Sequence, residues 1–159
     1  IGIAGGKEKC DWLKDVGADE VIDYKNSDIH QALPKVAKNG IDIYFDNVGG
    51  ETLETVLSLI NINARILLCG GISSGYDGSP LPNGPKNLFS LIIKRATMQG
   101  FLVLDYLPNS DKAIGEIATW VMEGKIQHRE DIQEGIENCP QTLNRLFKGE
   151  NKGKQLLKI

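Results

Sequence analysis

The sequence predicts an α/β fold built on a mostly parallel sheet. Apolar strand patterns alternate with amphipathic helix patterns along most of the 159 residues, and this alternation is typical of parallel strands joined by right-handed helical crossovers. One strand pattern, "ARILLCG", is a continuous apolar run, as expected when helices cover both faces of a sheet. We therefore expect five strands, at residues 1–4, 20–24, 41–48, 64–69 and 98–103.

The segments between these strands carry the apolar periodicity of helices. Ser27 is the expected N-cap of the second helix, and residues 53, 56, 57 and 60 form one apolar stripe on the third. We expect helices at residues 7–16, 27–38, 51–60, 86–94 and 110–123.

The last part of the chain, residues 125–159, is more polar than the rest. It predicts an extended segment, a helix with Leu143, Leu146 and Phe147 facing inward, and a terminal strand at 154–159. This tail is expected to belong to a different layer or a second domain, whereas residues 1–124 form the α/β domain.

Composition excludes several classes of partner. The net charge of −3 gives no reason to expect nucleic acid or an anionic membrane as a partner, and the sequence has no apolar run long enough to span a bilayer. The 3 cysteines lie far apart, which is neither a disulfide framework nor a zinc-site spacing. We therefore predict no metal site and a reducing, cytoplasmic location.

The first turn, "IAGGKEKC", resembles a phosphate loop but has the wrong spacing. A dinucleotide fingerprint needs G-x-G-x-x-G between strand and helix, and Gly2, Gly5 and Gly6 do not fit it. Lys7 and Lys9 also fall in the first helical turns, where cations oppose the helix dipole. Two interpretations stay open: lysine contacts to the 2′-phosphate of NADP, or a solvated helix start.

Two later turns, "DNVGG" and "CGGISSGY", also follow apolar strands. The carboxyl ends of parallel strands meet at one edge of a sheet, where open α/β sheets bind ligands. Asn47 and the glycines Gly70 and Gly71 are therefore candidate ligand contacts, with ordinary turns as the alternative. Cys69 is interpreted as a core residue, and the sequence identifies no catalytic residue.

Together, several segments resemble the zinc-independent medium-chain dehydrogenase/reductases. They include "AGGKEKCDWLKDVGADEVIDYKN", "IDIYFDNVGGETLE", "RILLCGGIS", "GPKNLFSLIIKRATMQGFLVLDY", "WVMEGKIQ" and "FKGENKGKQLLK". The sequence is most similar to the NADP-dependent prostaglandin, curcumin and plant double-bond reductases, and the resemblance covers essentially the whole chain.

The resemblance implies reduction of the C=C bond of α,β-unsaturated ketones or aldehydes by NADPH, without a metal. By position, Lys9 matches the family's 2′-phosphate lysine and Tyr24 a tyrosine near that phosphate. The other cofactor contacts implied by position are Asn47, the turn Cys69, Gly70, Gly71, Ile72 and Ser73, the segment Phe101, Leu102 and Val103 beside the nicotinamide, and Asn151. Tyr76 is shifted by one position relative to a family tyrosine, so its contact with substrate stays open.

The resemblance also implies an incomplete Rossmann-type doubly wound sheet. Family members place a substrate-binding domain and a first βα unit before the strand that corresponds to residues 1–4. The sheet is then expected to lack its central strand, between strands 1–4 and 41–48. Three alternatives stay open: the parent chain or another chain supplies the strand, the two flanking strands close up, or the sequence is a piece of a longer protein. We expect the last. The tail, 125–159, then belongs to the substrate domain.

The resemblance further predicts a homodimer formed through the edge strand 98–103. The alternatives to an enone reductase are a quinone reductase of the same superfamily and a non-catalytic, truncated nucleotide-binding or interaction module.

Overall fold

The computed structural model describes residues 1–73 and 83–159. Its strands are β1 (Gly2–Ala4), β2 (Val21–Asp23), β3 (Ile41–Asp46), β4 (Ile60–Leu68), β5 (Thr97–Gly100), β6 (Glu130–Glu134) and β7 (Lys154–Lys158). The helices are α1 (Lys7–Asp15), α2 (Ile29–Val36), α3 (Gly50–Leu59), α4 (Phe89–Lys94), α5 (Ser110–Met122) and α6 (Cys139–Phe147), with short 3-10 helices η1 (Val103–Asn109) and η2 (Ile136–Asn138). The predicted α/β fold is confirmed.

The strands form three small parallel sheets. β1 pairs with β2, and β3, β4 and β5 form a second sheet in that order. β6 pairs with β7 in a third sheet. Within these sheets every pairing is parallel, as the alternation of strands and helices predicts.

A groove of about 340 Å³ lies where the first two sheets face each other. Its lining includes Ile3 of β1 and Ile41 and Ile43 of β3, and in the described residues β1 and β3 are not paired. Leu33 of α2 and Val56 of α3, each 1% exposed, also line it. Because β1 and β3 are not paired in the described residues, the structure does not show the alternative in which the two flanking strands close up.

The core lies between α2, α3 and β4. Leu33, Val56, Leu57, Ile60 and Ile66 are each 1% exposed. The predicted apolar stripe of α3 is therefore confirmed, and burying each such side chain contributes about 1.5–3 kcal/mol. This core holds in place the turn between β3 and α3, and that turn forms one side of the candidate site described below.

Some predicted boundaries are wrong. β5 ends at Gly100, so Phe101–Val103 is not strand, and η1 begins at Val103. The N-cap of α2 is Asp28 rather than Ser27, because the Asp28 carboxylate accepts the N–H of His30 at 2.9 Å. Cys69 is exposed rather than buried, since β4 ends one residue before it.

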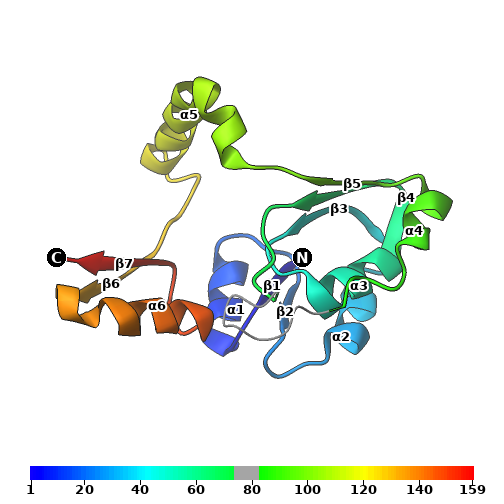
Figure 1. Cartoon of the computed structure of the whole chain (residues 1–159), viewed down its shortest axis with the longest axis horizontal. Helices are drawn as coiled ribbons and strands as arrows, with labels where there is room; N and C mark the ends of the chain where they lie inside the picture. The colour runs from blue at the N-terminus through cyan, green and yellow to red at the C-terminus, as the bar shows by residue number, and fades with distance from the viewer. Residues whose placement is uncertain (74–82) are drawn as a thin grey trace.

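The tail forms a unit of its own, β6–α6–β7, beside α1 (Figure 1). Leu143, Leu146 and Phe147 of α6 are 53%, 42% and 43% exposed, so the expectation that they face inward is wrong. Helix α5 stands away from the sheets (Figure 1), and none of its residues is buried. No helix in the described ranges is long and apolar enough to cross a membrane.

Candidate functional site

The turns that follow β1 and β2 are held together by Asp23. Its carboxylate accepts the backbone N–H groups of Gly6 at 2.8 Å and Lys25 at 3.0 Å, and the side-chain amide of Asn26 at 2.7 Å. The N–H of Gly6, followed by the amide of Asn26, lowers the pKa of Asp23. Gly6 has φ +90, a conformation that glycine adopts without strain. The start of α1 is thus tied to the end of β2.

Lys9 and Tyr24 project from these turns toward the end of α6. The Nζ of Lys9 donates to the carbonyl oxygen of Gly149 at 2.6 Å. The Tyr24 hydroxyl lies 3.4 Å, and the Lys9 Nζ 3.9 Å, from the point where a Cβ would stand on Gly149. Burial, then the charge of Lys25, lowers the pKa of Lys9. Lys9 and Tyr24, the two residues expected near the 2′-phosphate, therefore lie close together beside Gly149.

The turn after β3 is organised by Asp46, which is 1% exposed. Its Oδ1 accepts the N–H groups of Val48 and Gly49 and the hydroxyl of Tyr44, each at 2.9 Å. Burial, then the charge of Asp46, raises the pKa of Tyr44, so this hydroxyl remains a donor. Asp46 thereby fixes the backbone on both sides of Asn47.

Asn47 and the turn after β4 lie against each other. The N–H of Ile72 donates to the carbonyl of Asn47 at 3.1 Å, and the N–H of Ser73 to that of Val48 at 3.0 Å. The N–H groups of Cys69 and Gly70 both donate to the carbonyl of Asp46, at 2.8 and 3.1 Å. A Cβ on Gly70 would stand 3.4 Å from the Asn47 carbonyl oxygen. The backbone of the turn after β4 therefore lies close to the backbone of the turn after β3.

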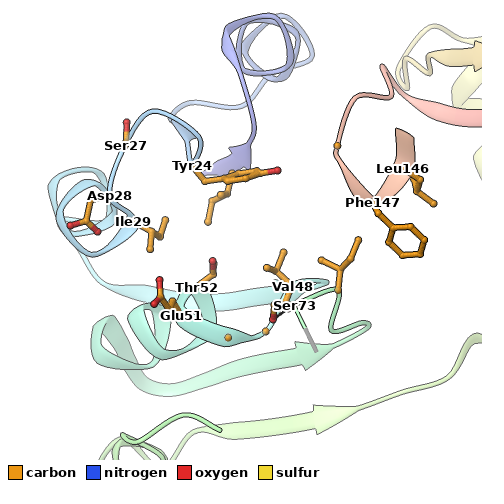
Figure 2. Close-up of a pocket in the computed structure, with 15 residues that line it drawn as sticks. Tyr24, Ser27, Asp28, Ile29, Val48, Glu51, Thr52, Ser73, Leu146 and Phe147 are labelled. Carbon is orange, nitrogen blue, oxygen red and sulfur yellow. Dashed lines mark hydrogen bonds between the residues drawn. The ribbon is translucent and has the colours of Figure 1, made fainter. Parts of the chain in front are cut away.

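These turns and the end of α6 enclose a pocket of about 710 Å³ (Figure 2). This volume is within the range of about 300–1,000 Å³ typical of ligand sites. Tyr24 lies on one side of the pocket, Val48 and Ser73 on the facing side, and Phe147 of α6 at one end. The pocket therefore lies at the carboxyl ends of the parallel strands, where open α/β sheets bind ligands.

Other predicted site residues lie elsewhere among the described residues. The Phe101 ring packs against Phe45 and Tyr106, with centroids 5.9 and 6.3 Å away, and Leu102 and Val103 are 57% and 64% exposed. Asn151 follows α6 and donates its amide to the carbonyl of Gly153 at 2.7 Å. Gly71 joins Gly70 to Ile72 in the β4 turn. Tyr76 lies outside the described residues.

Several pocket residues have no signal in the sequence that singles them out. Ser27, Asp28 and Ile29 line the pocket from the start of α2, and Glu51 and Thr52 from the start of α3. They are recognisable only once the strand ends are placed side by side. Asp23 and Asp46 do carry a signal, because each is a carboxylate that directly ends a strand.

The sequence profile of the zinc-binding dehydrogenase family matches residues 1–119. The chain belongs to this family. Among curated relatives, it is 45% identical over 162 residues to the putative NADP-dependent oxidoreductase YfmJ of Bacillus subtilis, covering 100% of this chain and 48% of that protein. It is 41% identical over 165 residues to the NADPH-dependent curcumin reductase of Escherichia coli, with 100% and 48% covered.

A solved member of the family shares the fold. CurA of Vibrio vulnificus, whose crystal structure contains NADPH, matches with a TM-score of 0.88 and 42% identity over 99% of this chain and 48% of CurA. The chain spans about half the length of the relatives it matches. The predicted resemblance to the medium-chain dehydrogenase/reductases that include prostaglandin, curcumin and plant double-bond reductases is thus confirmed.

Within residues 1–73 and 83–159, no group of three or more His, Cys, Asp or Glu side chains is arranged to hold a metal ion. The polar groups that line the pocket include the hydroxyls of Tyr24, Thr52 and Ser73.

Proposed function

We propose that this chain is the cofactor-binding part of an NADPH-dependent reductase of conjugated enones and enals. The observation that carries the proposal is the pocket of about 710 Å³ at the strand ends, with Lys9 and Tyr24 meeting beside it at Gly149. NADPH dependence in a relative that is 41% identical supports it. When bound, NADPH supplies hydride to the β-carbon of the conjugated double bond.

The residues on the phosphate side fit this cofactor. A Cβ on Gly5 would stand 2.8 Å from Cζ and 2.9 Å from the hydroxyl of Tyr24, so any larger residue would fill that space. Lys9 and Tyr24 would hold the 2′-phosphate through an ammonium and a hydroxyl, which are donors that suit a phosphate. Asn47, Ile72 and Ser73 would contact the cofactor from the facing turns, and Phe101–Val103 and Asn151 complete the proposed contacts.

We propose that residues 1–124 are part of a Rossmann-type domain and that 125–159 belong to a substrate domain. The groove between β1 and β3 supports this division, because a further parallel strand would join the two sheets there. In the working enzyme that strand would also bring the pyrophosphate loop to the pocket. The chain by itself is then expected to be weakly active or inactive.

The decisive experiment measures NADPH oxidation with enones, enals and quinones in parallel. It uses this chain and a form lengthened upstream to the size of the relatives. We expect the lengthened form to reduce enones and enals faster than quinones. Oxidation only with quinones would favour the quinone reductase, and no oxidation with any acceptor would reject the enzyme assignment.

We also propose a homodimer formed through β5, together with the residues up to Val103, in the cytoplasm. Leu102, Val103 and Leu104 are each more than half exposed beside β5, which supports an interface there. The free thiols of Cys10, Cys69 and Cys139 support a reducing compartment. Analytical ultracentrifugation that finds only monomer at high protein concentration would reject the dimer, and cell fractionation tests the location.

A further inference from the structure

Three hydrogen-bond donors meet beside the end of α6. The Nζ of Lys9 donates to the carbonyl of Gly149 at 2.6 Å, and the Nζ of Lys25 donates to the neighbouring carbonyl of Lys148 at 3.3 Å. The Tyr24 hydroxyl points toward the same end of α6 (Figure 2), and it has no hydrogen-bond partner in the part of the chain that the structure describes. An ammonium carries three N–H donors, so Lys9 and Lys25 each retain unused ones.

The two lysines, here called the lysine pair, lack a counter-ion. In the described ranges neither ammonium is within 4.0 Å of a carboxylate. The charge of Lys25 helps to lower the pKa of Lys9, after burial. The carboxylate that acts on Lys9 is Asp131, and it is already bound to Arg145 at 2.8 Å. Among the residues that the structure describes, the ammonium groups of Lys9 and Lys25 are bonded only to carbonyl oxygens, so the uncompensated positive charge favours the binding of an anion beside them.

The space between the donors is kept open by two glycines. A Cβ on Gly5 would stand 2.9 Å from the Tyr24 hydroxyl and 3.0 Å from Cε of Lys25. A Cβ on Gly149 would stand within 4 Å of both the Tyr24 hydroxyl and the Lys9 Nζ. Gly5 does not have a positive φ, so space rather than backbone conformation explains the glycine. Because Gly5 and Gly149 have no side chains, the lysine pair and the Tyr24 hydroxyl can surround one small open space.

We propose that Lys25 is a second cationic contact for the 2′-phosphate of NADPH, and that the lysine pair ties this phosphate to the turn after α6. The inference rests on the proposed function. Because each ammonium keeps its bond to a carbonyl of residues 148 and 149, binding of the phosphate adds a bridge rather than breaking one. Lys25 thus contributes to the choice of NADPH over NADH and couples the cofactor to the tail.

Calorimetry with two isomeric nucleotides tests the contact. Adenosine 2′-monophosphate and adenosine 5′-monophosphate carry the same charge and differ only in where the phosphate is attached. We expect Lys25→Met to weaken binding of the 2′ isomer by about tenfold, the loss typical of a hydrogen bond to a charged group, with little effect on the 5′ isomer. Lys38→Met removes an exposed lysine beyond the far end of α2 and should change neither.

If Lys25→Met binds the 2′ isomer with the same affinity as Lys38→Met, the proposed contact is wrong. If the wild-type chain and its lengthened form prefer the 2′ isomer and Lys25→Met keeps that preference, only the Lys25 assignment fails. If neither wild-type form prefers the 2′ isomer, the NADP assignment of the proposed function fails as well. Thermal unfolding of each variant confirms that it is folded.

Hydrogen–deuterium exchange tests the bridge to the tail. We expect the 2′ isomer to slow exchange in residues 145–153 of the wild-type chain, and we expect this slowing to be smaller in Lys25→Met at equal occupancy. Binding of the 2′ isomer without any slowing in this segment would show that the phosphate is not tied to the turn after α6.

Discussion

At the scale of single residues, two buried or half-buried carboxylates position the turns of the site. Asp23 binds the turns after β1 and β2, and Asp46 binds the turn after β3. Neither has a partner of opposite charge in the described residues. Each instead accepts two backbone N–H groups and one side-chain donor, Asn26 for Asp23 and Tyr44 for Asp46.

Asp46→Asn should destabilise the fold. The other oxygen of Asp46, Oδ2, is buried without a partner in the described residues, and an amide would place an N–H₂ group there or lose the bonds at Oδ1. Weakening such bonds costs about 1–3 kcal/mol. Urea denaturation measures the loss, and Asp19→Asn at an exposed position is the control. Equal losses in the two variants would contradict this role.

Lys9→Ala should weaken binding of NADPH far more than binding of NADH. The Lys9 ammonium is proposed to contact the 2′-phosphate, which NADH lacks, and a charged hydrogen bond of this kind is worth about tenfold or more in affinity. Dissociation constants for both cofactors, measured with the lengthened form, test it. Lys7→Ala is the control, since Lys7 is exposed and paired with Asp11. An equal loss for both cofactors would reject the phosphate role of Lys9.

At the scale of elements, Asp131 holds the tail unit together. It accepts the guanidinium of Arg145 from α6 at 2.8 Å, the N–H of Lys152 at 3.0 Å and the amide of Gln133 at 2.9 Å. The N–H of Lys152 is the main cause that lowers the pKa of Asp131, with Gln133 and Arg145 adding to it. One carboxylate therefore joins β6, α6 and the turn before β7.

The contribution of Asp131 should depend on pH. Its pKa is lower in the folded than in the unfolded chain, so its stabilising effect is present above the unfolded value of about 3.9 and is lost as the pH falls through the folded value. We expect Asp131→Asn to unfold more easily than the wild type near neutral pH, with the difference shrinking below about pH 4. Urea denaturation over a pH series tests this. The neighbouring exposed Glu130→Gln should show no such dependence.

At the scale of the whole molecule, stability is unevenly distributed. The buried side chains cluster between α2, α3 and β4, whereas α5 buries none. Local opening costs least where few apolar contacts are lost. We expect hydrogen–deuterium exchange to be slowest in α3 and β4 and fastest in α5, at a rate close to that of an unfolded peptide. Strong protection of α5 in a monomer would contradict this distribution.

The sequence predicted the α/β fold and the position of several turns at the strand ends. Ile72 and Ser73 line the pocket, and the Asn47 carbonyl accepts the N–H of Ile72. The proximity of these turns was predictable because parallel strands bring their carboxyl ends together.

Asp23 and Asp46 were not singled out, although each directly ends a strand. Lys25 was not singled out because its bond to the carbonyl of Lys148 joins segments far apart in the sequence. Cys69 was predicted wrongly because an apolar run does not reveal that its strand ends one residue earlier.

The further strand proposed to lie between β1 and β3 has a thermodynamic consequence: we expect this chain to bind it as a ligand. An apolar peptide that enters parallel to both neighbours meets Ile3 on one side and Ile43 on the other, and it can form backbone hydrogen bonds to two strands at once. By mass action, the free energy of unfolding then rises with the concentration of the complementing strand. We therefore expect the apparent stability of this chain to include the binding free energy of that strand.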